Sequence, residues 1–413
     1  MTDTVTIEPA APPAVTLTPG EWVRKRLFNN WYNSLLTLVL GTGIVYAVVS
    51  VTRAIFNFDY KILRDNLRVF MVGLFPRDQL WRPWVAGFLL ALAIGLAAGV
   101  AYSAAKERAA EAGIPFRETS LRDILRRFWP FLMLLVIILA LTTTPLPAVL
   151  TVATLLVGYG AYIGGRVLPT GVRRWAALAV VLFGVGAYLA LAAFGGVGWA
   201  GWGGLHLNVF LTVAGIIFAF PLGLLLALGR RSTLPVVRML SVTYIEVVRG
   251  VPLIAILLFG YFAIGFVLPQ ALRPSVVTRM LIAITMFEAA YVAEVVRGGL
   301  AAVPSGQREA SQALGMPTWK TMRFIVLPQA LRATIPAMVG QFISLWKDTT
   351  LVAILGVLDV LRVAFSVNTQ PDFLGQGLFA LTLPFAALIF WVGSYTMSRE
   401  ARRLEKKLGV GER

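Results

Sequence analysis

The chain of 413 residues contains no cysteine and a single histidine, His206. The lack of cysteine excludes disulfides, thiol catalysis and Cys-ligated metals. One imidazole cannot form a histidine metal cluster, and it makes a Ser-His-Asp triad implausible. His206 lies in GGLHLN at the start of an apolar run, where we expect an interfacial or capping role. The sequence therefore excludes thiol, triad and Cys/His metal chemistry.

Charged residues are also scarce, at 14% of the chain against 58% hydrophobic residues. A soluble domain is about half apolar and about a quarter charged, so this balance indicates an integral membrane protein. The net charge of +17 would suggest nucleic acid in a soluble protein. Here Lys and Arg gather in the loops between apolar runs, as the positive-inside rule requires. We therefore expect membrane lipid and no nucleic acid as a partner.

The apolar runs predict an all-α polytopic integral membrane protein with about ten transmembrane helices. With the N-terminus inside, most basic loops are cytoplasmic, and an even number of spans returns the C-terminus to the cytoplasm. The basic loop of residues 53–82 disagrees, because this topology places it outside; a missed span or an interfacial helix there stays open. The expected spans are Asn33–Val51, Pro83–Tyr102, Phe128–Leu141, Ala148–Gly165, Trp175–Gly195, Asn208–Leu228, Val251–Leu268, Val277–Val296, Ala333–Leu345 and Leu378–Ser394.

Composition divides the chain into three regions. Residues 1–20 are polar and Pro-rich, which predicts a disordered cytoplasmic tail, and they lack the pattern of a cleaved signal peptide. Residues 21–200 form an N-terminal multi-span region with few intramembrane charges. Across residues 203–407, charges and prolines lie beside or inside spans, where charge is costly and tends to mark function. The working site is therefore expected in this third region.

The stretch REASQALGMPTWKTMRFIVLPQAL, residues 308–331, predicts two short cytoplasmic helices at an angle. Glu309 falls in a first turn, where a negative charge suits the helix dipole. Gly315 stands where a helix ends in a left-handed residue, and Pro317 suits the start of a second helix. Pro328 limits or kinks that helix before the next span. The elbow either fits a groove on another protein or is an ordinary solvated loop.

The spacing of this elbow is similar to the EAA loop of ABC importer permeases. The pattern is Glu309-Ala310-x-x-x-x-Gly315, nine residues, then Ile325-x-Leu327-Pro328. The resemblance implies that residues 304–328 form coupling helices in a cleft of a separate ATPase. Ser311 replaces the second alanine of the pattern, and its small size is expected to leave docking unchanged. The residues expected to couple to the ATPase are Arg308, Glu309, Ala310, Ser311, Gly315, Ile325, Leu327 and Pro328.

Three further stretches narrow the resemblance to polar amino acid permeases. They are YIEVVRGVPL (244–253), AEVVRGG (293–299) and KDTTLV (347–352), and the N-terminal NLRVFMVGLFPRDQLWRP resembles general L-amino acid permeases. The resemblance implies a C-terminal five-helix type I importer core at residues 203–407. It also implies a permease subunit of a bacterial inner-membrane importer for polar or general L-amino acids. The implied partners are ATPase subunits, a second permease chain that is identical or different, and a periplasmic or lipid-anchored binding protein.

The chain shows no phosphate-binding loop. The nearest stretch begins at Gly315 and has Trp319 where the second glycine belongs. We therefore expect no cofactor on this chain and no enzymatic activity, with ATP and Mg²⁺ on the partner ATPase. An ion-coupled secondary transporter is the alternative, although the sequence shows no inverted repeat or intramembrane ion site. A non-transporting scaffold or sensor is a second rival.

Two acid–base pairs at a spacing of three residues predict a cytoplasmic salt-bridge network that positions the coupling loop. They are Glu246 with Arg249 and Glu294 with Arg297.

Four residues near or within spans are candidates for the translocation path. Glu288 lies mid-span and pairs either with a substrate ammonium or with a donor on a neighbouring span. Lys347 and Asp348 either form a local ion pair that closes a broken helix or line the path together with Thr349.

Overall fold

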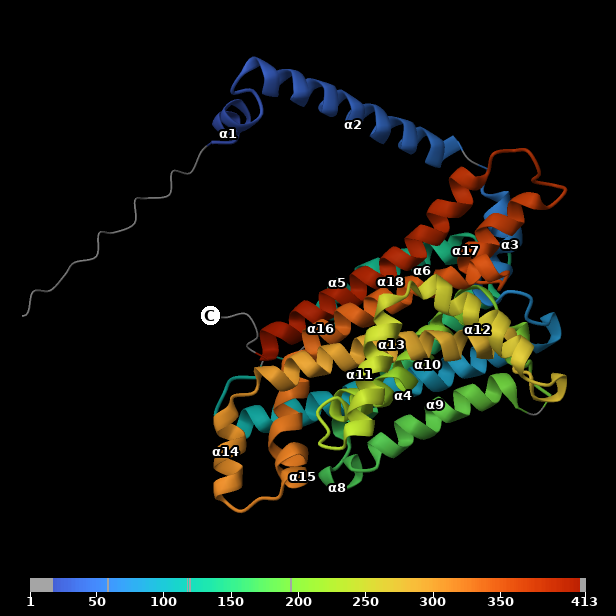
Figure 1. Ribbon diagram of the computed structural model, residues 1–413. Coiled ribbons are helices and arrows are strands. Elements are labelled where there is room, and N and C mark those ends of the chain that lie inside the picture. Colours follow the sequence, from blue (N-terminus) through green and yellow to red (C-terminus); the bar gives the residue numbers. More distant parts are fainter. Residues whose placement is uncertain (1–17, 58, 117, 119, 194, 409–413) are drawn as a thin grey trace, which may run out of the picture. The chain divides into compact units, whose positions relative to one another are not determined.

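The computed structural model describes residues 18–57, 59–116, 118, 120–193 and 195–408 (Figure 1). Over these residues the regular elements are all helices, which confirms the all-α prediction. The chain divides into two compact units, Met1–Asp59 and Tyr60–Arg413. The boundary falls at residue 59, so helices on both sides of the predicted division at residues 200–203 lie in one compact unit.

The first unit contains α1 (Pro19–Arg26) and α2 (Trp31–Asn57). Thr18 begins α1 through a capping box: its hydroxyl accepts from the Glu21 N–H at 3.4 Å, and the Glu21 carboxylate accepts from the Thr18 N–H at 3.0 Å. The end of the predicted disordered tail therefore starts a helix, while residues 1–17 lie outside the described residues. The α2 helix carries the first expected span.

The second unit contains the remaining helices. In chain order they are α3 (Lys61–Val72), η1 (Arg77–Gln79), α4 (Trp81–Glu111), α5 (Leu121–Arg127), α6 (Trp129–Ala140), α7 (Leu146–Val167), α8 (Thr170–Arg173), α9 (Ala176–Ala192), η2 (Trp199–Gly201), α10 (Gly204–Gly229), α11 (Pro235–Gly250), α12 (Leu253–Val267), η3 (Gln270–Leu272), α13 (Val276–Ala302), α14 (Ser305–Ala313), α15 (Thr318–Lys320), η4 (Thr321–Val326), α16 (Leu327–Asp348), η5 (Thr349–Leu355), α17 (Val360–Ser366), η6 (Val367–Thr369) and α18 (Phe379–Leu408).

Each of the ten expected spans coincides with one helix: α2, α4, α6, α7, α9, α10, α12, α13, α16 or α18. Among the described residues, six helices are long and apolar enough to cross a membrane, and the count is seven if the bent pair α11–α12 is one span. The α6 and α9 helices are apolar but shorter. Hydropathy therefore located the ten helices. Among the described residues, six of them are long and apolar enough to cross the membrane on their own.

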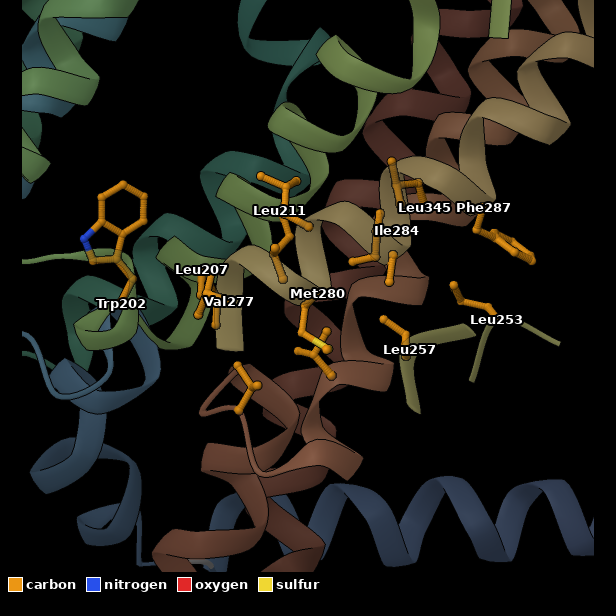
Figure 2. Packing of buried hydrophobic residues seen from close by; sticks show 14 of the residues in the cluster. Trp202, Leu207, Leu211, Leu253, Leu257, Val277, Met280, Ile284, Phe287 and Leu345 are labelled. Atoms are coloured by element: carbon orange, nitrogen blue, oxygen red, sulfur yellow. The ribbon is translucent and has the colours of Figure 1, made fainter. Parts of the chain in front are cut away.

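The helix α13 lies at the centre of the second unit, since 67% of its apolar segment is buried. Figure 2 shows side chains from α10, α13 and α16 in one cluster, among them Leu211, Ile284 and Leu345. All three are at most 1% exposed. A helix that is apolar on nearly every face belongs in an interior. Movement of either end of α13 therefore reaches the packing of its neighbours α10 and α16.

The basic loop of residues 53–82 contains α3, whose 12 residues reach only about 18 Å and cannot span a bilayer. One face of α3 is buried and apolar, including Ile62 and Phe70. The Phe70 ring contacts the edge of Phe385 of α18 at 5.1 Å between centroids. Asn66 and Gln370 exchange two amide hydrogen bonds of 3.2 and 2.8 Å. The basic loop therefore contains a packed amphipathic helix, not a missed span.

The helices α4 and α7 pack backbone to backbone through glycines. A Cβ at Gly99 would collide with the Tyr162 carbonyl oxygen and lie 2.9 Å from the Gly165 Cα. We expect Gly99→Leu to separate these helices and to lower the free energy of unfolding by roughly 3 kcal/mol. Thermal unfolding of the purified chain in detergent measures this loss. Gly87→Leu on the same helix is the control, because a Cβ there meets nothing within 4 Å; equal losses in both variants would contradict the prediction.

Candidate functional site

The predicted elbow is present at one end of the second unit, where Figure 1 shows α14 and α15 next to each other beyond the end of α13. The α14 helix ends at Ala313, and Gly315 takes the left-handed conformation, with φ of +72°. The Met316 N–H donates to the Ser311 carbonyl at 3.0 Å, which closes the turn. Pro317 then precedes the first residue of α15. The predicted break at Gly315 is confirmed.

Pro328 does not end the second arm of the elbow. The chain is helical from Thr318 to Asp348, and the π-helical segment η4 joins α15 to α16. The Leu327 N–H donates to the Met322 carbonyl, five residues back. Pro328 then occupies the first turn of α16, and because it has no N–H it donates no hydrogen bond to the helical turn before it. The predicted helix end at Pro328 is therefore wrong; the structure has a π-helical turn directly before Leu327 and Pro328, and the other predicted outcome, a kink, stays a prediction.

The inner face of the elbow is fixed by a pair of hydroxyl groups. Ser311 is 1% exposed, and its Oγ lies 2.9 Å from the Oγ1 of Thr321. Because the Ser311 hydroxyl donates its proton to the Arg308 carbonyl at 2.7 Å, it accepts from Thr321. Ser311 therefore holds the two arms together from the inside and does not lie on the outer surface.

The outer face of the elbow is apolar with an acidic residue on it. Leu314, Trp319 and Phe324 are 81%, 59% and 60% exposed, and Glu309 is also exposed. Sequence reasoning did not single out Leu314 for this surface, because it marked only the end of a helix. Of the other predicted coupling residues, Ala310 and Pro328 are exposed, whereas Arg308, Ile325 and Leu327 are half-buried.

Four arginine–glutamate contacts join α11, α13 and the residue after α10. Glu294 lies at the centre: its carboxylate contacts Arg297 at 2.5 Å, Arg249 at 3.6 Å and Arg230 at 3.8 Å. Arg230 also pairs with Glu246 at 2.8 Å. The structure thus brings all four predicted residues into one network, but Glu246 pairs with Arg230 and not with Arg249. Sequence reasoning missed Arg230 as a member because its partners are distant in the chain.

Two further arginines contact the end of α13, and one of them, Arg308, lies on the elbow. Arg231 and Arg308 both donate to the Leu300 carbonyl, at 3.4 and 3.5 Å. Burial lowers the pKa of the Arg231 guanidinium below its usual range, and the nearby charges of Arg308 and Arg297 lower this pKa further. These donors suit the negative end of the α13 dipole. The first helix of the elbow is therefore attached to the central helix of the unit.

Glu288 is 1% exposed on α13. Its Oε2 accepts from the Gln341 side chain of α16 at 3.1 Å, so the structure pairs it with a donor on a neighbouring span. Its Oε1 is buried without a hydrogen-bond partner among the described residues. One carboxylate oxygen therefore connects two spans, and the other has no such bond.

Of the other candidates for the path, Asp348 lies close enough to Glu288 to interact with it electrostatically, whereas Thr349 belongs to a different group of residues. Thr349 is fully buried and accepts from the Asn208 side chain at 3.0 Å, and Asn208 also donates to Asp359 at 3.3 Å. Lys347 is exposed and Asp348 is half-buried, and no ion pair within 4 Å joins these two described residues. Thr349 therefore belongs to a buried polar cluster whose other members, Asn208 and Asp359, sequence reasoning missed.

Known proteins resemble this chain along its length. Residues 219–409 match the family described as binding-protein-dependent transport system inner membrane component. The inner membrane amino-acid ABC transporter permease protein YhdY of Escherichia coli K12 is 32% identical, over 94% of this chain and 93% of that protein. The glutamate/glutamine/aspartate/asparagine transport system permease protein BztC of Rhodobacter capsulatus is 45% identical, over 50% of this chain and 47% of that protein.

Among solved structures, the crystal structure of an amino acid ABC transporter with histidines aligns with a TM-score of 0.44 and 28% identity. The alignment covers 48% of this chain and 90% of that one. The similarity to YhdY, by contrast, also includes the N-terminal helices. The chain therefore belongs to the family of binding-protein-dependent transport system inner membrane components, and it is a multi-pass permease subunit of an ABC transporter.

Proposed function

We propose that this permease imports polar or general L-amino acids and that a separate ATPase drives it through the elbow. The elbow is the observation that carries the coupling: it presents Leu314, Trp319 and Phe324 to solvent at the end of a membrane unit. Exposed apolar side chains on a rigid helical turn suit a groove on a partner protein. The names of the relatives YhdY and BztC support amino acids as the substrate class.

The proposed coupling path runs from the elbow into the spans. The Ser311–Thr321 pair keeps the two arms together, so a force on either arm moves both. Arg308 passes this movement to the end of α13 through the Leu300 carbonyl. Glu294, farther along α13, transmits it to α11 through Arg249. Closure of the ATPase would thereby shift the central helix and alternate the access of the path.

The expected arrangement of partners follows from this path. One elbow engages one ATPase subunit, so a second permease chain, identical or different, supplies the second elbow. A periplasmic or lipid-anchored binding protein delivers the solute on the opposite side. This arrangement requires the elbow to lie in the cytoplasm, and an even number of spans would put both termini of the chain there as well.

Glu288 is the proposed contact for the substrate ammonium. Gln341 occupies only one of its oxygens, at 3.1 Å, so the second oxygen is available to a cation without loss of the bond between the two spans. A carboxylate that is nearly fully buried is costly unless it is paired, which favours a functional reason for its position.

Uptake into proteoliposomes tests this function. We expect labelled glutamine or glutamate to accumulate only when the permease is combined with its ATPase, its binding protein and ATP. An ionophore that collapses ion gradients is expected to leave the uptake unchanged. Accumulation by the permease alone, or uptake that the ionophore abolishes, would support an ion-coupled transporter and contradict the proposal.

A further inference from the structure

A cavity of about 550 Å³ opens between α4 and α7, away from the elbow and the ion-pair network. The two helices are in close backbone contact at Gly99 and Gly165. Beyond this contact, both helices carry large side chains that face the cavity. Tyr102 and Lys106 of α4, Tyr159 and Arg166 of α7, and Arg173 of α8 line the resulting space.

The lining of the cavity is cationic. Lys106, Arg166 and Arg173 face a single carboxylate, Glu107, which Arg173 already occupies at 2.7 Å. Within the described part of the chain, Lys106 forms one ion pair, an exposed contact with Glu118 at 3.2 Å, and exposed pairs are weak and easily exchanged. No carboxylate of the described residues lies within 4 Å of Arg166. The cavity therefore has an excess of positive charge that an anion would neutralise.

Arg166 is held in place by aromatic rings instead of acids. Its guanidinium lies 4.2 Å from the Tyr102 ring centroid and 5.6 Å from that of Tyr162. Its Nη2 also donates to the Tyr102 hydroxyl at 3.4 Å. Stacking fixes the plane of a guanidinium but leaves N–H groups along its edge for other acceptors. Such a fixed fork matches the oxygens of a phosphate.

The cavity lies at the depth of lipid headgroups. The α7 helix has 22 residues and is roughly 33 Å long, about the thickness of the hydrocarbon core. Arg166 stands one residue before its end. Ile163 and Val167 also line the cavity and are 43% and 75% exposed. The same opening therefore offers cations for a headgroup and apolar side chains for an acyl chain.

We propose that this cavity binds the phosphate of an anionic phospholipid, with Arg166 and Lys106 as its principal contacts. Basic pockets between transmembrane helices recognise anionic headgroups in this manner. The lipid would link α4 to α7 at the point where their backbones separate. Free phosphate has the same contacting oxygens but lacks the acyl chain that Ile163 and Val167 would cover.

Native mass spectrometry of the full-length chain in detergent tests the proposal. The probes are phosphatidylglycerol, phosphatidylcholine of the same acyl chains, and inorganic phosphate. We expect retention of phosphatidylglycerol over phosphatidylcholine, and no displacement by inorganic phosphate. Arg166→Gln and Lys106→Gln should each weaken the retention about fivefold, because each removes one cation near the headgroup.

Arg174→Gln is the matched control. Arg174 is an exposed basic residue that directly follows Arg173 in the chain, but it does not line the cavity. Its retention of phosphatidylglycerol should equal that of the unaltered chain. The Lys106 variant keeps the test valid if loss of the Arg166 stacking disturbs folding. Equal retention by all variants, no preference for phosphatidylglycerol, or displacement by inorganic phosphate would each overturn the proposal.

Discussion

Gly315→Val is expected to abolish ATP-driven uptake while the chain still folds. The φ of +72° at Gly315 costs a residue with a Cβ about 1–2 kcal/mol, and a β-branched side chain adds strain. A Cβ at this position meets nothing within 4 Å, so the backbone is affected and no neighbour is displaced. The turn is then expected to change conformation, which changes the angle between α14 and α15. Uptake into proteoliposomes with the ATPase and the binding protein measures the effect.

Gly315→Asn is the control at the same site. Asparagine adopts the left-handed conformation far more readily than valine, so the elbow keeps its shape and most of the uptake should remain. Thermal unfolding of both variants shows whether they fold equally well. Normal uptake by Gly315→Val would refute the coupling role of the elbow.

Glu294→Gln is expected to uncouple the elbow from the spans and to lower the free energy of unfolding by roughly 2 kcal/mol. Glu294 is the one acceptor shared by Arg230, Arg249 and Arg297. A neutral amide keeps the size of the side chain but removes the ion-pair partner of Arg249 and Arg297 at the α10–α11–α13 junction, while Arg230 keeps its pair with Glu246. ATP hydrolysis without uptake, measured in the same proteoliposomes, would show that the junction transmits the movement.

Glu246→Gln provides the comparison, because among the described residues Glu246 forms one ion pair, with Arg230, and its side chain is 54% exposed. An exposed pair contributes about 1 kcal/mol or less, so this variant should retain most of the stability and the uptake. If Glu246→Gln lowered the stability and the uptake as much as Glu294→Gln does, the prediction that Glu294 transmits movement from the elbow to the spans would be wrong.

Local features of the sequence predicted the helices and the elbow well. Hydropathy located the expected spans because a lipid-facing helix must be apolar over its whole length. Gly315 and Pro317 marked the elbow because glycine adopts the left-handed backbone without a steric cost and proline has no N–H to lose at a helix start. The network around Glu294 was partly visible because Glu294 and Arg297 are one helical turn apart.

Contacts between distant parts of the chain were not predictable in this way. Nothing local to Glu246 indicates that Arg230, on another element, would displace Arg249 as its partner. The grouping of Thr349 with Asn208 joins residues 141 positions apart. The π-helical segment before Pro328 was missed because its hydrogen-bond register depends on how the elbow is held.

The packing of α3 has a consequence for where this permease can be truncated. Gly73, at the end of α3, is so close to Gly203 that a Cβ there would lie 2.5 Å from the Gly203 Cα. A chain shortened to begin at the C-terminal core would lose Phe70, which covers Phe385, and Asn66, which accepts a hydrogen bond from the Gln370 side chain. The C-terminal core therefore relies on α3 to cover part of its buried surface, and removal of α3 is expected to destabilise it.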